Sequence, residues 1–153
     1  IDFRLTSLLA YLDANHVALP PSDWSKLRVS GHSQGASMAY WLAKNRGVRF
    51  GCFLGGPFDA PDPVNPGPDR IADWFTTEPH LTPVTRLGAF VANSDDNYQQ
   101  FVRAYGIIGL TRDREWFEAN QATYSDGAVA IDGHAATVKD PALAGLRAKA
   151  CFR

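Results

Sequence analysis

The sequence predicts an α/β protein in which helices cover both faces of a mostly parallel sheet, giving three layers. Short apolar segments typical of buried strands, such as 48–54 and 86–92, alternate along the chain with segments of helical spacing, such as 36–45. The 153 residues, of which 45% are hydrophobic and 20% charged, are enough for one domain, which we assign to 1–153. In sheets of this kind, functional groups collect at the carboxyl ends of the strands.

The first half of the chain is expected to hold two helices and two strands. Leucines recur at helical spacing within 3–15, and a second helix is expected over 36–45, ending before Gly47. The segments 26–30 and 48–54 have the composition of strands. A loop is expected over 59–70, because four prolines and a glycine exclude regular structure there.

The second half is expected to continue the alternation of helices and strands, on the same criteria of spacing and composition. The expected elements are a short helix from 73 to 75, a strand at 86–92, a helix at 97–105, a helical turn at 115–120, a strand at 128–131 and a closing helix at 141–151.

The pentapeptide 31–35 fits the G-x-S-x-G pattern of a nucleophile elbow, in which a turn between a strand and a helix presents a serine hydroxyl. Its context is the required one, because a strand-like segment precedes it and a helical segment follows. We expect Gly31 and Gly35 to lie where a Cβ would clash with the turn. Amides at the start of the helix would face an anion that forms near Ser33. A Gly/Ser-rich turn without catalytic function is the alternative.

A serine hydroxyl needs a histidine base, and the histidine needs a carboxylate that holds it in the correct tautomer. Asp95 and Asp96 follow the predicted strand 86–92, and His134 follows the strand 128–131. The three other histidines fit less well. His32 is expected to pack inside the elbow, and the remaining two are His16, which precedes the serine, and His80, which precedes the acids.

The elbow and the order serine, aspartate, histidine make the chain resemble the α/β-hydrolase superfamily, in particular bacterial serine hydrolases of unassigned substrate. The resemblance implies Ser33 as nucleophile, His134 as base and the backbone N–H of Gln34 as one oxyanion donor. In the loop common to these proteins, the acid stands four residues past the end of the strand. Counting from Ala92 favours Asp96 as the acid, with Asp95 as the alternative.

The resemblance also implies several strands and a second oxyanion donor before the elbow, yet only 32 residues precede Ser33. We therefore expect the chain to be the C-terminal part of an α/β-hydrolase-like fold. The expected function is that of a serine esterase acting on a small-molecule ester through an acyl-enzyme. A non-catalytic binding module and an acyltransferase are the alternatives. The loop 59–70, with Trp74 and Phe75, is expected either to form part of a cap over an apolar acyl pocket or to be a structural loop.

The composition argues against other function classes. The net charge of −1, without a basic block, gives no electrostatic support for nucleic-acid binding. No apolar run approaches the roughly 20 residues that span a membrane, and the first residues lack the plan of a signal peptide, so a soluble protein of undetermined compartment is expected. No cofactor or metal site is expected. Cys52 is expected to be a buried free thiol, with a disulfide to Cys151 as the alternative.

Overall fold

A computed structural model describes residues 7–8, 10–11, 14–15, 23–59 and 71–152. Its centre is a four-stranded sheet in the order β1-β2-β3-β4, in which all strands are parallel. The strands are β1 (Arg28–His32), β2 (Phe50–Leu54), β3 (Leu87–Ala92) and β4 (Trp116–Ala119). The expected α/β class with a mostly parallel sheet is confirmed.

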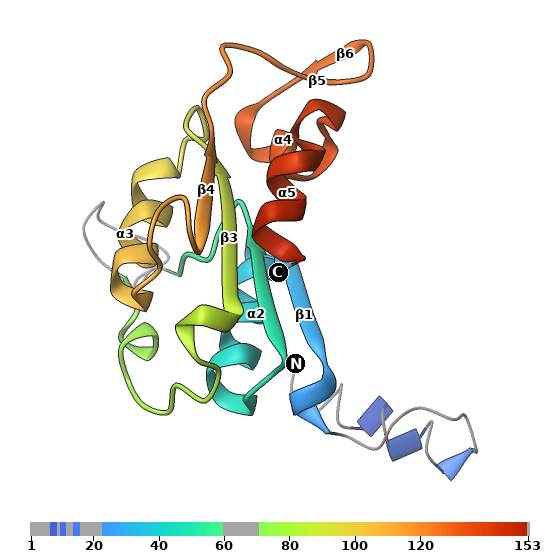
Figure 1. Cartoon of the computed structure of the whole chain (residues 1–153), viewed down its shortest axis with the longest axis vertical. Helices are drawn as coiled ribbons and strands as arrows, with labels where there is room; N and C mark the ends of the chain where they lie inside the picture. Colours follow the sequence, from blue (N-terminus) through green and yellow to red (C-terminus); the bar gives the residue numbers. More distant parts are fainter. Residues whose placement is uncertain (1–6, 9, 12–13, 16–22, 60–70, 153) are drawn as a thin grey trace.

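Helices cover both faces of the sheet, so the three expected layers are present (Figure 1). On one face lie α2 (Gln34–Arg46) and α3 (Tyr98–Ile108), and on the other lie α4 (Gly133–Lys139) and α5 (Ala144–Cys151). A hairpin of β5 (Tyr124–Asp126) and β6 (Val129–Ile131) stands apart from the sheet. Short 3₁₀ turns complete the described chain: Trp24–Lys26, Asp73–Phe75, Val84–Arg86 and Pro141–Leu143.

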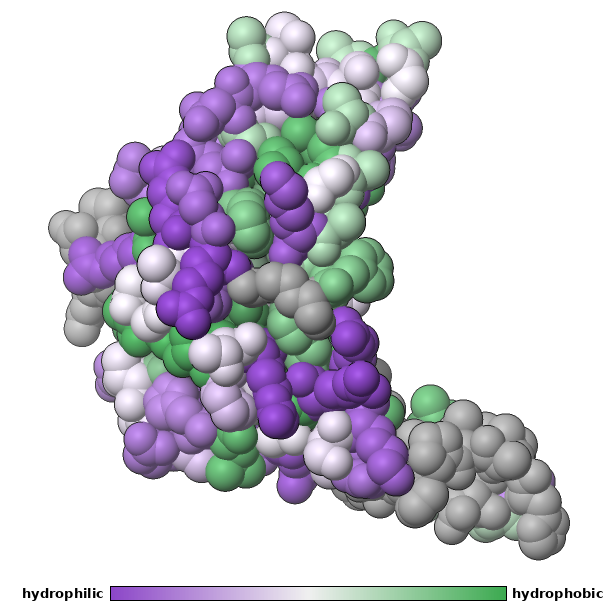
Figure 2. Space-filling model, in the orientation of Figure 1, coloured by the Kyte–Doolittle hydropathy of each residue, from purple (hydrophilic) through white to green (hydrophobic). Residues whose placement is uncertain are grey.

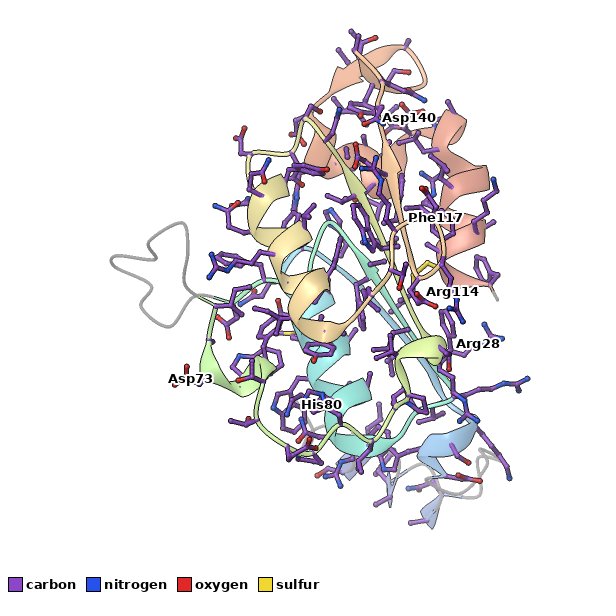
Figure 3. All side chains as sticks on the ribbon, turned by 60° about the vertical axis from the view of Figure 1, so that its left-hand side comes forward. Arg28, Asp73, His80, Arg114, Phe117 and Asp140 are labelled. Atoms are coloured by element: carbon purple, nitrogen blue, oxygen red, sulfur yellow. A yellow bond between two sulfur atoms is a disulfide. The ribbon has the colours of Figure 1, made fainter. Side chains whose placement is uncertain are left out.

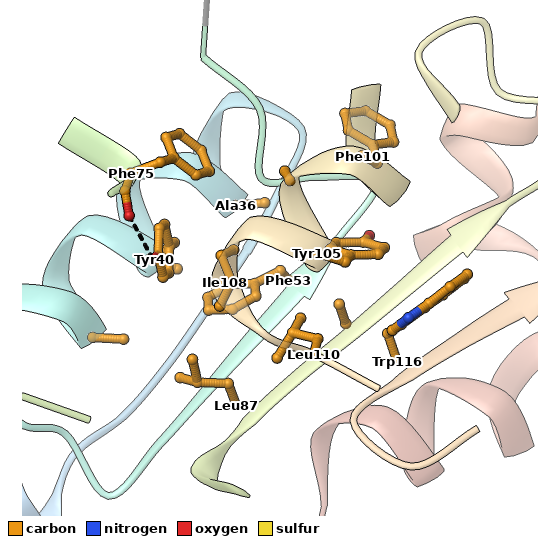
Figure 4. Packing of buried hydrophobic residues seen from close by; sticks show 14 of the residues in the cluster. Ala36, Tyr40, Phe53, Phe75, Leu87, Phe101, Tyr105, Ile108, Leu110 and Trp116 are labelled. Carbon is orange, nitrogen blue, oxygen red and sulfur yellow. Dashed lines mark hydrogen bonds between the residues drawn. The ribbon is translucent and has the colours of Figure 1, made fainter. Parts of the chain in front are cut away.

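The core has two parts, one on each face of the sheet. Figure 4 shows the larger part, where Phe53 from β2 meets Tyr40 of α2 and Tyr105 of α3. The smaller part lies under α4 and α5 and contains Phe50, Phe90 and Leu143, among others. Because side chains alternate across a strand, neighbouring residues such as Phe90 and Val91 supply opposite parts. This two-sided burial explains why these strands read as continuous apolar runs.

Most expected elements are found where the sequence placed them, with three corrections. The segment predicted as a helical turn, 115–120, instead forms β4, the fourth strand of the sheet. The strand expected at 128–131 pairs with β5 in the hairpin and does not join the main sheet. His134 lies in α4, a helix that was not among the expected elements. Of the helix expected over 3–15, residues 7, 8, 10, 11 and 14 are helical, and its remaining residues lie outside the described ones. Residues 60–70 of the expected loop also lie outside the described residues.

Cys52 of β2 and Cys151 at the end of α5 form a disulfide, with a Cα–Cα distance of 5.2 Å. The expectation of a free thiol at Cys52 is therefore wrong, and the alternative pairing is the one observed. The positions of the two cysteines in the sequence could not predict this disulfide, because their sequence separation is 99. The bond appears in yellow between the sheet and α5 in Figure 3.

Hydrophobic side chains gather along the right-hand side of the face drawn in Figure 2, the side on which α5 lies. A groove between β1, β2 and α5 is lined by Val29, Leu54 and Phe152 among others. Phe152 is 77% exposed there. In the described part of the chain, no helix is long and apolar enough to cross a membrane.

Candidate active site

The elbow forms as the sequence predicted, with β1 leading into it and α2 leading out. Ser33 has φ 58° and ψ −126°, a backbone conformation that costs energy in a residue with a side chain. Two hydrogen bonds hold it: the Ser33 N–H donates to the Leu54 carbonyl at 3.0 Å, and the Ser33 carbonyl accepts from the Ala36 N–H at 2.9 Å. The turn thus anchors the serine between the ends of β1 and β2.

The two glycines of the motif play different parts. A Cβ on Gly31 would lie 1.9 Å from the Gly35 carbonyl oxygen and 2.7 Å from the Ala36 nitrogen, so only glycine fits. A Cβ on Gly35 would meet nothing within 4 Å. The expectation that both positions are crowded is therefore right for Gly31 and wrong for Gly35.

His134 lies beside the carboxyl end of the sheet and binds Asp95. Its Nδ1 is 2.6 Å from Asp95 Oδ2. The Asp95 side chain is almost fully buried, whereas that of His134 is 31% exposed. A buried carboxylate on Nδ1 leaves Nε2 as the nitrogen that can take a proton from a nucleophile, which is the arrangement that general-base catalysis requires.

The structure pairs His134 with Asp95 and not with Asp96, which the counting rule favours. The chain turns more tightly than the rule assumes, because the Asp95 N–H already donates to the carbonyl of Ala92 at 3.1 Å. The third residue after β3 therefore faces His134, and Asp96 is exposed. The second carboxylate oxygen of Asp95, Oδ1, accepts the N–H of Asn97, the residue just before α3, at 2.9 Å.

Close packing of α4 against the sheet brings His134 to this carboxylate. Asp132 caps α4 by accepting the Ala135 N–H at 2.7 Å. A Cβ on Gly133 would lie 2.4 Å from Ser94 Oγ and 2.9 Å from the Asp95 nitrogen, so glycine allows the two segments to touch. An aspartate before a segment of helix-forming residues, as in 132–139, is the sequence signal that would have identified this helix.

His32 packs against the candidate base, a contact that the sequence did not indicate. The two ring centroids are 4.6 Å apart, and His32 Nε2 lies 3.0 Å from the His134 carbonyl oxygen. The same carbonyl accepts the Thr137 hydroxyl at 2.9 Å. Gly55, just past β2, closes the other side, because a Cβ there would be 3.2 Å from the His134 ring. His134 is therefore held by contacts from several elements.

The serine and the histidine share this edge of the sheet, but in the described structure His134 does not hydrogen-bond to the Ser33 hydroxyl. Such bonds are often long before substrate binds. His80, one of the histidines set aside, lies near the last turn of α2, at the opposite end of the sheet (Figure 3). His16 lies outside the described residues.

Backbone amides at the start of α2 supply the positive end of the site. Gln34 is the first residue of the helix, and the N–H groups of a first turn have no partner within their own helix. They therefore favour an anion beside Ser33. Among the described residues, no group of three or more His, Cys, Asp or Glu side chains is arranged to hold a metal ion.

Comparisons with known proteins do not identify a relative. No family model matches the chain, and neither a curated protein nor a solved structure matches it.

Proposed function

We propose that the chain is a serine hydrolase that cleaves a carboxylic ester through a triad of Ser33, His134 and Asp95. The observation that carries the proposal is the pair of buried Asp95 and partly exposed His134, which lies at the same edge of the sheet as the strained elbow serine. A solvent-facing histidine would not need a buried carboxylate for folding. A base that must keep one tautomer through a proton transfer does need one.

In the proposed reaction, Ser33 Oγ attacks the carbonyl carbon of the ester while His134 Nε2 takes the hydroxyl proton. The Nδ1–H of His134 donates to Asp95 Oδ2, which stabilises the imidazolium. The negative charge that forms on the carbonyl oxygen is stabilised by the backbone N–H of Gln34. The tetrahedral intermediate then collapses, the bond to the alcohol oxygen breaks, and that oxygen receives the proton from His134.

The second half of the cycle repeats the same steps with water. His134 takes a proton from a water molecule, whose oxygen attacks the acyl carbon on Ser33, and the intermediate releases the acid and restores the serine hydroxyl. An alcohol in place of water would give a new ester, so an acyltransferase would use the same groups. An added alcohol acceptor in the assay separates these two reactions by their products.

One observation favours a second candidate, a binding module that has the fold of a hydrolase but no activity. In the described part of the chain, the Ser33 hydroxyl lacks a hydrogen bond to His134, so the nucleophile is not yet activated in this structure. The two candidates differ in the reactivity of Ser33 itself.

Labelling with a fluorophosphonate tests the proposal directly, because the probe reacts only with an activated serine. We expect the chain to be labelled, and Ser33→Ala and His134→Ala each to abolish labelling. Ser30→Ala and His80→Ala are the matched controls, because they remove the same functional groups at positions outside the pentapeptide 31–35 and are expected to label normally. Absence of labelling in the unaltered chain, with its fold intact, would favour the binding module.

A further inference from the structure

A cavity of about 450 Å³ opens beside the candidate nucleophile, along one face of α2. The helix contributes Gln34, Ser37, Met38 and Trp41. The segments that follow β2 contribute Phe58, Asp59 and Trp74. The cavity therefore begins one residue from Ser33, and its volume is in the usual range for a small-molecule site.

The helix residues of the cavity form one continuous surface that leads away from Ser33. Positions 34, 37, 38 and 41 follow the spacing i, i+3, i+4, i+7, which places their side chains on one face. From Gln34 to Trp41 the helix rises by about 10 Å. Side chains on a helix tilt toward its N-terminus, so Met38 and Trp41 lean toward the serine. The cavity thus has the position of a pocket for a substrate bound at Ser33.

Hydrogen bonds and packing fix the aromatic walls of this pocket. The indole N–H of Trp74 donates to Asp59 Oδ2 at 2.7 Å, and its ring lies 4.3 Å from that of Phe75, centroid to centroid. Phe58 is held from both sides by Ser37: the Phe58 N–H donates to Ser37 Oγ at 3.1 Å, and that hydroxyl donates to the Phe58 carbonyl at 2.7 Å. Because these side chains are already fixed, little side-chain conformational entropy is lost when a rigid group binds between them.

The chemistry of the lining selects flat, uncharged groups. Two indole rings, a phenyl ring and a thioether present polarisable surfaces that stack on an aromatic ring and gain energy beyond simple burial. The exposed carboxylate of Asp59 disfavours an anion at the same place. An aliphatic chain would bury apolar surface in this pocket but could not stack on its aromatic rings.

The acyl side of the ester is the part that faces this pocket. His134 must protonate the leaving alcohol, so the alcohol lies on the side of α4. The pocket is lined from α2 and the segments after β2, and neither His134 nor His32 contributes to it. We propose that the pocket binds an aromatic acyl group, so that the preferred substrates are esters of aryl-substituted acids without a further negative charge. This inference rests on the proposed function.

The test compares three methyl esters by titration of the acid released: methyl 2-naphthylacetate, methyl decanoate and methyl acetate. We expect kcat/KM for methyl 2-naphthylacetate to exceed that for methyl decanoate by about ten-fold or more. Trp41→Ala should lower kcat/KM for methyl 2-naphthylacetate about ten-fold, a clearly larger loss than on methyl acetate. Trp41→Phe keeps a flat ring and should retain most of the preference for methyl 2-naphthylacetate over methyl decanoate. It is the control for a loss of activity that is caused by misfolding.

Controls separate the pocket from general effects on the protein. Met38 and Ile107 are similarly exposed, at 38% and 40%, and only Met38 lines the pocket. Met38→Ala should lower activity on the naphthyl ester, whereas Ile107→Ala should not. A carboxyl group added to the naphthyl ring should abolish the preference, and Asp59→Asn should restore part of it.

The failures of the two proposals are distinguishable. Fluorophosphonate labelling of Ser33 together with equal kcat/KM values for methyl 2-naphthylacetate and methyl decanoate would overturn the aromatic pocket and leave the hydrolase proposal standing. An equal loss on all three esters in Trp41→Ala would also overturn the pocket. Neither labelling nor hydrolysis of any ester would overturn both.

Discussion

At the scale of single residues, a local pattern predicts the elbow turn, whereas contacts between segments far apart in the chain cannot be predicted from spacing. Ser33 could be predicted because the pattern 31–35 is local. The choice between Asp95 and Asp96 could not be made from spacing, because one backbone hydrogen bond in the turn after β3 decides which carboxylate faces His134. The contact of His32 with His134 joins segments 102 positions apart, and such a contact leaves no local signal.

Asp95→Asn is expected to lower kcat on an ester by about 10³- to 10⁴-fold, because an amide no longer fixes the tautomer of His134. Asp96→Asn is the matched control, since it makes the same change one residue away on an exposed side chain, and kcat should stay within about two-fold. Thermal unfolding of both variants shows whether the fold is kept. A loss of kcat in Asp96→Asn that equals the loss in Asp95→Asn would contradict the assignment.

The two elbow glycines give a second matched pair. Gly31→Ala is expected to lower the free energy of unfolding by about 3 kcal/mol, because its Cβ would overlap backbone atoms of α2. Gly35→Ala is expected to raise it by about 0.5–1 kcal/mol, because alanine favours the helix and has open space. Urea unfolding measures both changes. Equal destabilisation by the two substitutions would show that the turn is built differently.

At the scale of elements, composition predicts strands and helices that are long and buried, and it fails for short ones. β2 and β3 were predicted because both faces are covered, which makes them continuously apolar. β4 was missed because its burial is broken at Phe117 and Glu118, so its composition does not separate a strand from a helical turn. α4 was missed because it has only seven residues. Its place in the site follows from packing against β3.

The disulfide ties α5 to β2, and its removal tests how strongly that helix depends on it. A Cys52→Ala, Cys151→Ala variant is expected to lose about 2–4 kcal/mol of unfolding free energy in urea, because the open chain gains entropy when unfolded. Reduction of the unaltered protein should cause a similar loss. Reduction of the double variant serves as the control and should change nothing. If both reduced and oxidised proteins unfold at the same urea concentration, the bond does not stabilise the fold.

At the scale of the whole molecule, the parallel order of the sheet was predictable and its assembly was not. Strands that alternate with helices pair in parallel, so the residues that follow their carboxyl ends are expected at one edge of the sheet, as Ser33 and Asp95 are. The detachment of the β5–β6 hairpin was not predictable, because its pattern is that of any short strand. Among the described strands, β1 pairs only with β2, so the elbow lies at the margin of the described sheet.

Alkaline pH is expected to destabilise the protein through tyrosines whose pKa is raised in the folded state. Burial raises the pKa of Tyr40 to about 12, and burial with a hydrogen bond to Glu118 raises the pKa of Tyr98 to about 12. In the unfolded chain these phenols lose their protons near pH 10. Their raised pKa therefore contributes stability that is complete below pH 10 and is lost as the pH rises toward 12.

Urea unfolding at pH 8, 10 and 11 measures this loss. Tyr98→Phe should unfold more easily at pH 8, because its bond to Glu118 is missing, and should lose less stability between pH 10 and 11 than the unaltered chain. A pH dependence that is the same in both proteins would rule out Tyr98 as a contributor. Tyr105, whose pKa is also raised by burial, acts in the same direction and remains in both.

The disulfide between Cys52 and Cys151 closes a covalent ring of chain, and this ring has a topological consequence. Asp95 and His134 lie inside the ring, while Ser33 lies on the segment that leads into it. A single peptide-bond cut between the two cysteines would leave both pieces joined, so a nicked molecule would still carry all three groups on one covalent body. Only a reductant would then release the piece that contains Cys151 from the piece that carries the serine.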